Sequence, residues 1–348
     1  MSVNRIPSLD GWRCISILLV ISGHEITDGI QFGLSLSPKI LKFFIWSGYG
    51  VDIFYVISGY IITQLFLHEE NKNGDVNIKN FYLRRFFRII PPFFVFLLVV
   101  YMLSVFFHHE KISCLNWITA IFLITNLNYW NTWTWSLSHL GSLSFEEQYY
   151  LIWPFIFRKK RLRLLIPLIV IGISPILRAI KYKYPYLIGD FSFYITRIDT
   201  LFVGSLFAIY SDKIKEYKNT LIENLILAVT LFCIFSLKMT IPYTGFLTVP
   251  FSPTLFSLSV VILIKRSLKS ETILYKFLNY RAIVNIGKIS YSLYLLQQLF
   301  YPSSILGSQI ITKFPINFVC MFLCAYLSYK FIERPMYVWR VRRKIGVG

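Results

Sequence analysis

Long apolar runs, separated by short polar or basic segments, make up most of the chain. A helix needs ~20 mostly apolar residues to cross the ~30 Å hydrocarbon core of a bilayer, and many of these runs approach that length. The pattern therefore predicts an all-α, polytopic integral membrane protein: one transmembrane domain over residues 1–348, with ten spanning helices and no separate soluble domain. The helices are expected at about 12–30, 43–67, 89–107, 143–157, 164–180, 195–210, 220–237, 250–264, 289–306 and 314–332.

The region between the third and fourth predicted helices is irregular. Residues 117–129 are apolar but too short to span, and residues 126–141 are rich in Asn, Thr, Trp and Ser. The basic clusters at 84–88 and 158–163 both favour the cytoplasmic side, because Lys and Arg concentrate in cytoplasmic loops. An even number of crossings must then separate them, so 117–129 is predicted to be re-entrant or interfacial. The same rule places both termini in the cytoplasm.

Composition supports a membrane protein and argues against two other classes. Of the 348 residues, 55% are hydrophobic and 15% charged, whereas about a quarter of the residues of a soluble domain are charged. The net charge of +19 would suit nucleic-acid binding, but the basic residues lie in short clusters between apolar runs, as membrane topology requires. The five cysteines form no CxxC pair, so no disulfide framework and no metal site is predicted.

The first apolar run carries ionisable residues at both ends. Asp10 and Arg13 stand at its start, and His24 follows Arg13 by eleven positions, about three turns or 16 Å along the same helix face. With Arg13 at the headgroups, His24 lies near the middle of the bilayer, where an ionisable group costs about 2.5–3.5 kcal/mol and usually faces a polar cavity. His24 is therefore a candidate for chemistry; the alternative is a buried histidine that hydrogen-bonds a neighbouring helix. Asp10 is interpreted as a helix N-cap or as a further catalytic group.

Seven short motifs follow one another along nearly the whole chain. They are LDGWR at 9–13 with His24, GVDIFYVISGY at 50–60, FYLRRFFRIIP at 81–91, SLSFEEQYYL at 142–151, RID at 197–199 with Gly204, SYSLYL at 290–295, and ERP at 333–335. In these motifs and their order, the chain resembles the bacterial membrane acyltransferase family 3, whose members O-acetylate extracytoplasmic glycans. The resemblance implies an enzyme of the bacterial inner (cytoplasmic) membrane. It would move an acyl group, usually acetyl, from acyl-CoA to a hydroxyl of an extracytoplasmic or lipid-linked glycan.

The chain departs from the family pattern at two positions. Gly141 stands where the family often has Trp, and Gln297 stands where a His commonly follows SYSLYL. The second departure leaves His24 as the main candidate for an acid–base role. Within the second motif, Ser58-Gly59 is interpreted as a close helix-packing site, with passage of the donor's arm as the alternative.

On this resemblance, His24 is the expected general base or transient acyl carrier, because imidazole exchanges protons near neutral pH. Glu147 is expected to orient the imidazole, with a structural ion pair to an arginine as the alternative. Acetyl-CoA is the expected donor substrate, and arginine forks suit its phosphates, although basic residues at this face are also ordinary topology signals. The expected donor-binding residues are Arg13, Arg84, Arg85 and Arg88.

Four residues are expected to contact the acceptor: Glu146, Arg197, Asp199 and Trp135. The alternative for Arg197 and Asp199 is a pair with each other. Trp135 can stack on a sugar ring together with Trp130 and Trp133, or all three can belong to an interfacial aromatic belt. The expected partners are acyl-CoA, the glycan or lipid-linked sugar, and membrane lipid; a homodimer is also compatible.

A membrane transporter is the rival hypothesis. Buried His24, Glu147 and Arg197 would then form a proton or substrate pathway. Transporters often contain internal repeats, and the sequence shows no such repeat.

Overall fold

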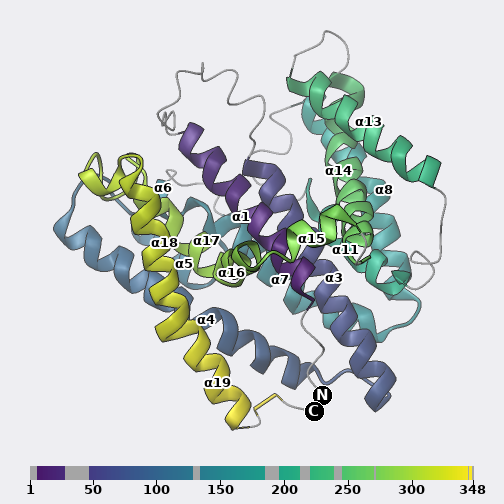
Figure 1. Cartoon of the computed structure of the whole chain (residues 1–348), viewed down its shortest axis with the longest axis horizontal. Coiled ribbons are helices and arrows are strands. Elements are labelled where there is room, and N and C mark those ends of the chain that lie inside the picture. The colour runs from purple at the N-terminus through teal and green to yellow at the C-terminus, as the bar shows by residue number, and fades with distance from the viewer. Residues whose placement is uncertain are drawn as a thin grey trace. The chain divides into compact units, whose positions relative to one another are not determined.

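The computed structural model describes residues 6–27, 47–127, 134–184, 196–211, 220–238, 245–269, 272–343 and 345–346. Every regular element in these ranges is a helix, so the all-α class is confirmed. Figure 1 shows the helices coloured along the chain. The predicted end of the first helix at 30 and start of the second at 43 lie outside the described residues.

The α-helices have the following bounds: α1 Pro7–Thr27, α3 Ser47–Asn73, α4 Ile78–Phe106, α5 Cys114–Ile121, α6 Trp135–Ser138, α7 Leu140–Arg158, α8 Leu162–Lys183, α11 Ile198–Ile209, α13 Thr220–Lys238, α14 Gly245–Ser267, α15 Ile273–Leu278, α16 Arg281–Lys288, α17 Ser290–Leu296, α18 Ile316–Ser328 and α19 Arg334–Arg342. Short 3-10 helices lie at η1 Thr125–Leu127, η2 Gln297–Phe300 and η3 Ile310–Thr312, and a π turn, η4, lies at Tyr329–Glu333.

Five of the described helical runs are long and apolar enough to cross a membrane. They are Gly48–Asn73, Ile78–Phe106, Leu162–Lys183, Thr248–Ser267 and Ile316–Arg342. These runs support the multi-pass prediction. The count of ten helices and the re-entrant segment at 117–129, where α5 ends and η1 lies, stay predictions.

The first helix begins earlier than predicted. α1 starts at Pro7, and proline suits a first helical turn because its φ is already helical and its missing N–H is not needed there. Asp10 therefore lies inside the first turn, and the prediction that it is the N-cap is wrong. Its carboxylate lies 3.4 Å from Nη1 of Arg13.

The arginine-rich motif at 81–91 is helical, whereas the pattern predicts a loop before it and a helix from about Ile89. α4 begins at Ile78, because Asn77 caps it: the Asn77 side-chain oxygen accepts the N–H of Asn80 at 2.9 Å. The Pro91-Pro92 pair, expected at the helix entry, lies inside α4. Membrane helices tolerate internal proline where neighbouring groups satisfy the freed backbone.

The last two predicted helices also differ from the structure. α17 ends at Leu296 and continues as η2 only to Phe300, whereas the pattern predicts a helix to residue 306. The final helical run continues through η4 and α19 to Arg342 instead of ending near 332. The change to a 3-10 helix matters for the site, because η2 carries Gln297 and Gln298.

The chain forms two compact units. The first unit contains residues 1–18, 48–76 and 148–287, and the second contains residues 19–47, 77–147 and 288–348. α1 and α7 therefore contribute residues to both units.

In the first unit, α8, α11, α13 and α14 pack together (Figure 1). The start of α1 is tied to the end of α14 by two hydrogen bonds: Ser8 Oγ donates to the Ser267 carbonyl at 3.0 Å, and Trp12 Nε1 donates to Ser267 Oγ at 3.1 Å.

Gly59 of α3 and Gly204 of α11 form a close helix crossing in the first unit. A Cβ on Gly59 would collide with the carbonyl oxygen of Leu201, and a Cβ on Gly204 would collide with that of Val56. Only residues without a side chain let two helices approach this closely. The packing interpretation of Ser58-Gly59 is thus confirmed.

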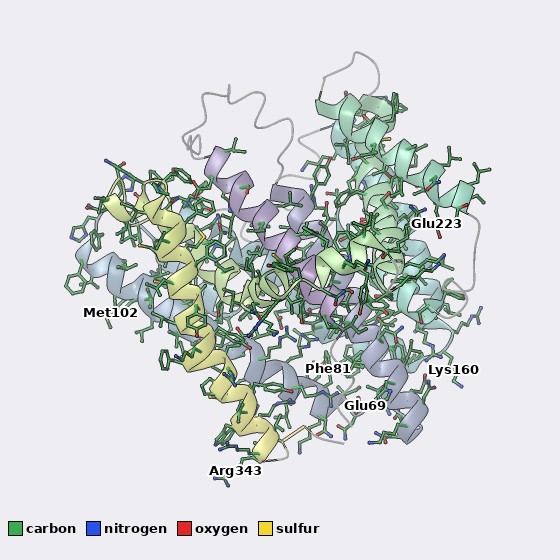
Figure 2. All side chains as sticks on the ribbon, in the orientation of Figure 1. Glu69, Phe81, Met102, Lys160, Glu223 and Arg343 are labelled. Atoms are coloured by element: carbon green, nitrogen blue, oxygen red, sulfur yellow. The ribbon has the colours of Figure 1, made fainter. Side chains whose placement is uncertain are left out.

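In the second unit, α17, η4 and α19 pack against α4, and Figure 1 shows the yellow run of α18 and α19 beside it. Figure 2 marks Phe81 and Met102 on α4. Phe81 is fully buried, whereas Phe94, Leu98 and Met102 are about half exposed and Phe106 about three-quarters exposed. These four recur every fourth residue and so share one face, which suits contact with lipid.

Candidate functional site

His24, near the end of α1, is held by Gln297. Its Nδ1 lies 2.9 Å from Gln297 Oε1, and the glutamine is completely buried. Because the amide oxygen is an acceptor, Nδ1 carries a proton, and in the neutral imidazole Nε2 then carries the lone pair. The imidazole is thus oriented in the tautomer that a general base requires.

Two aromatic rings enclose the same imidazole. The ring of Trp135 lies 5.9 Å from His24 at 65°, and that of Tyr301 lies 6.1 Å away at 85°. Tyr301 is itself fixed, since its hydroxyl donates to the Ile21 carbonyl of α1 at 3.2 Å. These contacts limit rotation of the His24 side chain, and such preorganisation is what a catalytic group needs.

A second histidine, His139, lies in the same unit and was missed by the sequence interpretation. Its Nδ1 lies 2.6 Å from Oε1 of Gln298, the residue next to Gln297. The Tyr294 hydroxyl donates to the His139 carbonyl at 3.0 Å, and the ring of Phe96 stands edge-on to the imidazole at 5.4 Å. The one sequence signal was the adjacent pair of glutamines after SYSLYL, each facing one imidazole.

Several buried polar atoms of this cluster have no hydrogen-bond partner among the described residues. They are Trp135 Nε1, Gln297 Nε2 and His139 Nε2. Leaving a buried donor or acceptor unpaired costs about 1–3 kcal/mol, so such groups call for an explanation in each case. A polar ligand that binds beside these atoms is one such explanation.

The arginines of α4 lie close to acidic residues in the second unit. The positive charges of Arg85 and Arg88 act on the carboxyl group of Glu147, as does the negative charge of the neighbouring Glu146. Glu147 is the last residue of α7 that belongs to the second unit. Tyr291 of α17 donates its hydroxyl to the Ile89 carbonyl at 2.9 Å. This hydrogen bond joins the motif at 290–295 to the motif at 81–91. The residue at His24 Nδ1 is Gln297, whereas Glu147 is the residue expected there from the sequence.

α4 also connects this charged cluster with the histidines. Arg88 and the His139 contact Phe96 are eight residues apart on the same helix, which is about 12 Å. Arg84 lies one turn before Arg88, and its Nη1 donates to the Gly346 carbonyl of the C-terminal tail at 3.0 Å.

The remaining predicted site residues belong to the first unit. Asp10 and Arg13 face each other on α1. Arg197 pairs with Asp52 at 2.7 Å, and Asp199 pairs with Arg178 at 3.1 Å. Arg197 and Asp199 are thus buried in two different ion pairs, and the predicted pair between them is wrong.

Trp130 and Trp133, which the sequence places with Trp135 as candidates for sugar stacking, lie outside the described residues. Across the described ranges, no group of three or more His, Cys, Asp or Glu side chains is placed to hold a metal ion.

The chain is similar to proteins of one enzyme family. Residues 6–330 match the model of an acyltransferase domain, acyltransferase family 3. The peptidoglycan O-acetyltransferase OatA of Listeria monocytogenes is 29% identical over 95% of this chain and 56% of its own length. The O-acetyltransferase OatA of Staphylococcus aureus is 29% identical over 96% of this chain and 58% of its own length. The chain thus spans a little over half the length of these curated relatives, and no solved structure matches it.

Six of the seven motifs lie within the residues that the family model matches, and the seventh, ERP at 333–335, lies just beyond them. The chain belongs to acyltransferase family 3.

Proposed function

We propose that this protein is a membrane O-acyltransferase. It moves an acyl group, most simply acetyl, from an acyl-CoA to a hydroxyl of a glycan outside the cytoplasm or of a lipid-linked sugar. The observation that carries the proposal is the His24 imidazole, held through Nδ1 by a buried glutamine and enclosed by Trp135 and Tyr301. Family membership and the names of the two relatives support the reaction class.

His24 acts as the general base of a direct transfer. Its Nε2 takes the proton of the acceptor hydroxyl while the hydroxyl oxygen forms a bond to the thioester carbonyl carbon. The carbon–sulfur bond then breaks, and the imidazolium returns the proton to the departing thiolate. The products are the O-acyl sugar and free CoA, and His24 returns to its starting state.

The arginines of α4 bind the phosphates of the donor in this proposal. A guanidinium offers the planar fork that phosphate oxygens accept, and Arg85 and Arg88 lie on the same helix as Arg84. Arg84, in the same unit, adds positive charge for the donor. Arg13 pairs with Asp10 in the first unit and is a separate candidate for donor binding.

The acceptor is proposed to be a peptidoglycan-like glycan, because one relative is named for peptidoglycan. Trp135, at His24, is the residue best placed to meet it. Glu146 is a second candidate contact. Arg197 and Asp199 are buried in ion pairs, so their contribution to acceptor binding is through the helices that they hold.

Thioester turnover by the purified protein tests the proposal. With a soluble glycan fragment added as acceptor, the wild type in detergent should release CoA from labelled acetyl-CoA, and His24→Ala should reduce this rate by about 10²–10⁴-fold, the usual effect of a positioned base. His108→Ala is the matched control, since this histidine is exposed. Equal rates for wild type and His24→Ala would contradict the assignment of His24. A wild type that moves solute across proteoliposomes but cleaves no thioester would favour the transporter.

A further inference from the structure

Two N–H donors beside His24 are buried and lack partners. The amide Nε2 of Gln297 and the indole Nε1 of Trp135 have no acceptor among the described residues. Gln297 is completely buried, so water from the bulk does not reach its amide. Both donors can therefore donate to an acceptor that the described residues do not supply.

Both donors belong to side chains that also contact the imidazole. Gln297 uses its amide oxygen to hold His24 Nδ1 at 2.9 Å, so the opposite end of the same planar group carries the unpartnered N–H. Trp135 stands edge-on to His24, with ring centroids 5.9 Å apart. The side chains that orient the His24 imidazole are thus the same ones that carry the two unpartnered N–H groups.

We propose that Gln297 Nε2–H and Trp135 Nε1–H form an oxyanion hole for the acyl carbonyl oxygen. The inference rests on the proposed function, because the ligand is the thioester of the donor. When the acceptor oxygen bonds to the carbonyl carbon, the C=O electron pair moves onto the carbonyl oxygen, and the two N–H groups donate to the resulting oxyanion. As the carbon–sulfur bond breaks, that pair re-forms the C=O, so the donors are unchanged at the end. Fixed donors aimed at such a charge are commonly the largest single contribution to acyl transfer.

The variants Trp135→Phe and Gln297→Glu each remove one donor and keep the shape of the side chain. Each should reduce kcat for acetyl-CoA cleavage by about 10²–10³-fold, with little change in KM, because the donors act on the transition state. Gln297→Glu separates two roles of this residue. The new carboxylate still accepts His24 Nδ1–H. If Gln297 served only to position the imidazole, Gln297→Glu would therefore keep or raise the activity.

Trp339→Phe is the matched control, because Trp339 is about half exposed on α19. It should keep the wild-type kcat. A wild-type kcat in Trp135→Phe, or an activity at or above wild type in Gln297→Glu, would overturn the oxyanion hole. Apparent Tm values of all variants show whether a loss of rate reflects unfolding.

Infrared spectroscopy gives a readout that does not depend on turnover. The probe is an acetyl-CoA analogue in which methylene replaces sulfur, so that its isotope-labelled carbonyl cannot be cleaved. In the wild type and in Trp339→Phe, the bound carbonyl stretch should lie below the free value, and in Trp135→Phe and Gln297→Glu it should move back toward it. A bound band at the same frequency in all proteins would overturn the inference while the acyl-CoA donor stands. Absence of any bound band in the wild type would overturn both.

Discussion

Arg197 and Asp199 are separated by one residue, yet each is neutralised by a different partner. The Asp199 carboxylate accepts from Arg178, and Thr254 donates to it as well. Arg178 is further saturated by the carbonyls of Pro250 and Thr196. A buried ion pair of this kind adds little net stability by itself, but removal of one member leaves the other charged and unpaired.

Asp199→Asn should therefore destabilise the protein by about 3–5 kcal/mol, since it leaves the buried Arg178 guanidinium without its counter-charge. The measurement is thermal unfolding of the purified protein in detergent. A double variant, Asp199→Leu with Arg178→Met, should recover much of the loss, because apolar residues of similar volume replace such pairs well.

Asp75→Asn is the matched control for this experiment. Asp75 and Arg158 form an exposed pair, and such pairs contribute about 0–1 kcal/mol. Hydrogen bonding to Arg158 holds the pKa of the Asp75 carboxyl below its usual range. Its small contribution is therefore present above the ordinary carboxyl pKa and is lost as the pH falls through the lowered one. A cost for Asp199→Asn no larger than that for Asp75→Asn would contradict the buried-charge argument.

For single residues, the sequence predicts His24 as the candidate catalytic group, but it does not predict that Gln297 hydrogen-bonds its imidazole. Gln297 was visible as a departure from the family pattern, yet its partner lies 273 positions away, and spacing says nothing about such a contact. His139 was hidden for the same reason. The carboxylate expected at the imidazole, Glu147, has arginines of α4 as its charge partners.

A helix crossing can depend on one or two residues. The crossing of α3 and α11 rests on two glycines that each face a backbone carbonyl of the other helix. Backbone atoms cannot move aside as a flexible side chain can, so any added Cβ must push the helices apart.

Gly204→Ala should lower the free energy of unfolding by about 1–3 kcal/mol, the usual cost of overpacking. Gly172→Ala is the matched control, since Gly172 is a helical glycine of α8 with nothing within 4 Å of an added Cβ. That substitution should be neutral or stabilising by up to about 1 kcal/mol. Chemical or thermal unfolding of both variants measures the difference, and equal stabilities would show that the crossing is looser than described.

The sequence predicts where most of these helices lie, but it predicts the residues at which they begin and end less accurately. Apolar runs located α7, α8 and α13 within a few residues. The charged start of α4 was interpreted as a loop, because its arginines hide the helix that the Asn77 cap begins. α17 was expected to be longer, because apolar periodicity does not distinguish an α-helix from the 3-10 helix that follows it.

For the molecule as a whole, the exposed apolar side chains indicate a lipid environment. Large apolar side chains are exposed along α4, α8 and α13, where a soluble protein would carry polar residues. Together with the family and the five long apolar runs, this surface indicates a multi-pass membrane protein. The inner-membrane location and the cytoplasmic termini stay predictions from the positive-inside pattern.

The last helical run has a consequence for the membrane that holds it. Ile316–Arg342 contains 27 residues, or about 40 Å of helix, whereas a typical hydrocarbon core is ~30 Å thick. The last part of the run, from Lys330 to Arg342, is basic and can extend beyond the hydrocarbon core into the headgroups. A core too thin or too thick for the apolar part causes tilt or local distortion of the lipid, at a fraction of a kcal/mol per Å. Because this run packs on α4, which carries Arg85 and Arg88, acyl-CoA cleavage should differ a few-fold between vesicles of short-chain and long-chain lipids. A rate independent of chain length would mean that the arginine-bearing helix does not feel the thickness of the bilayer.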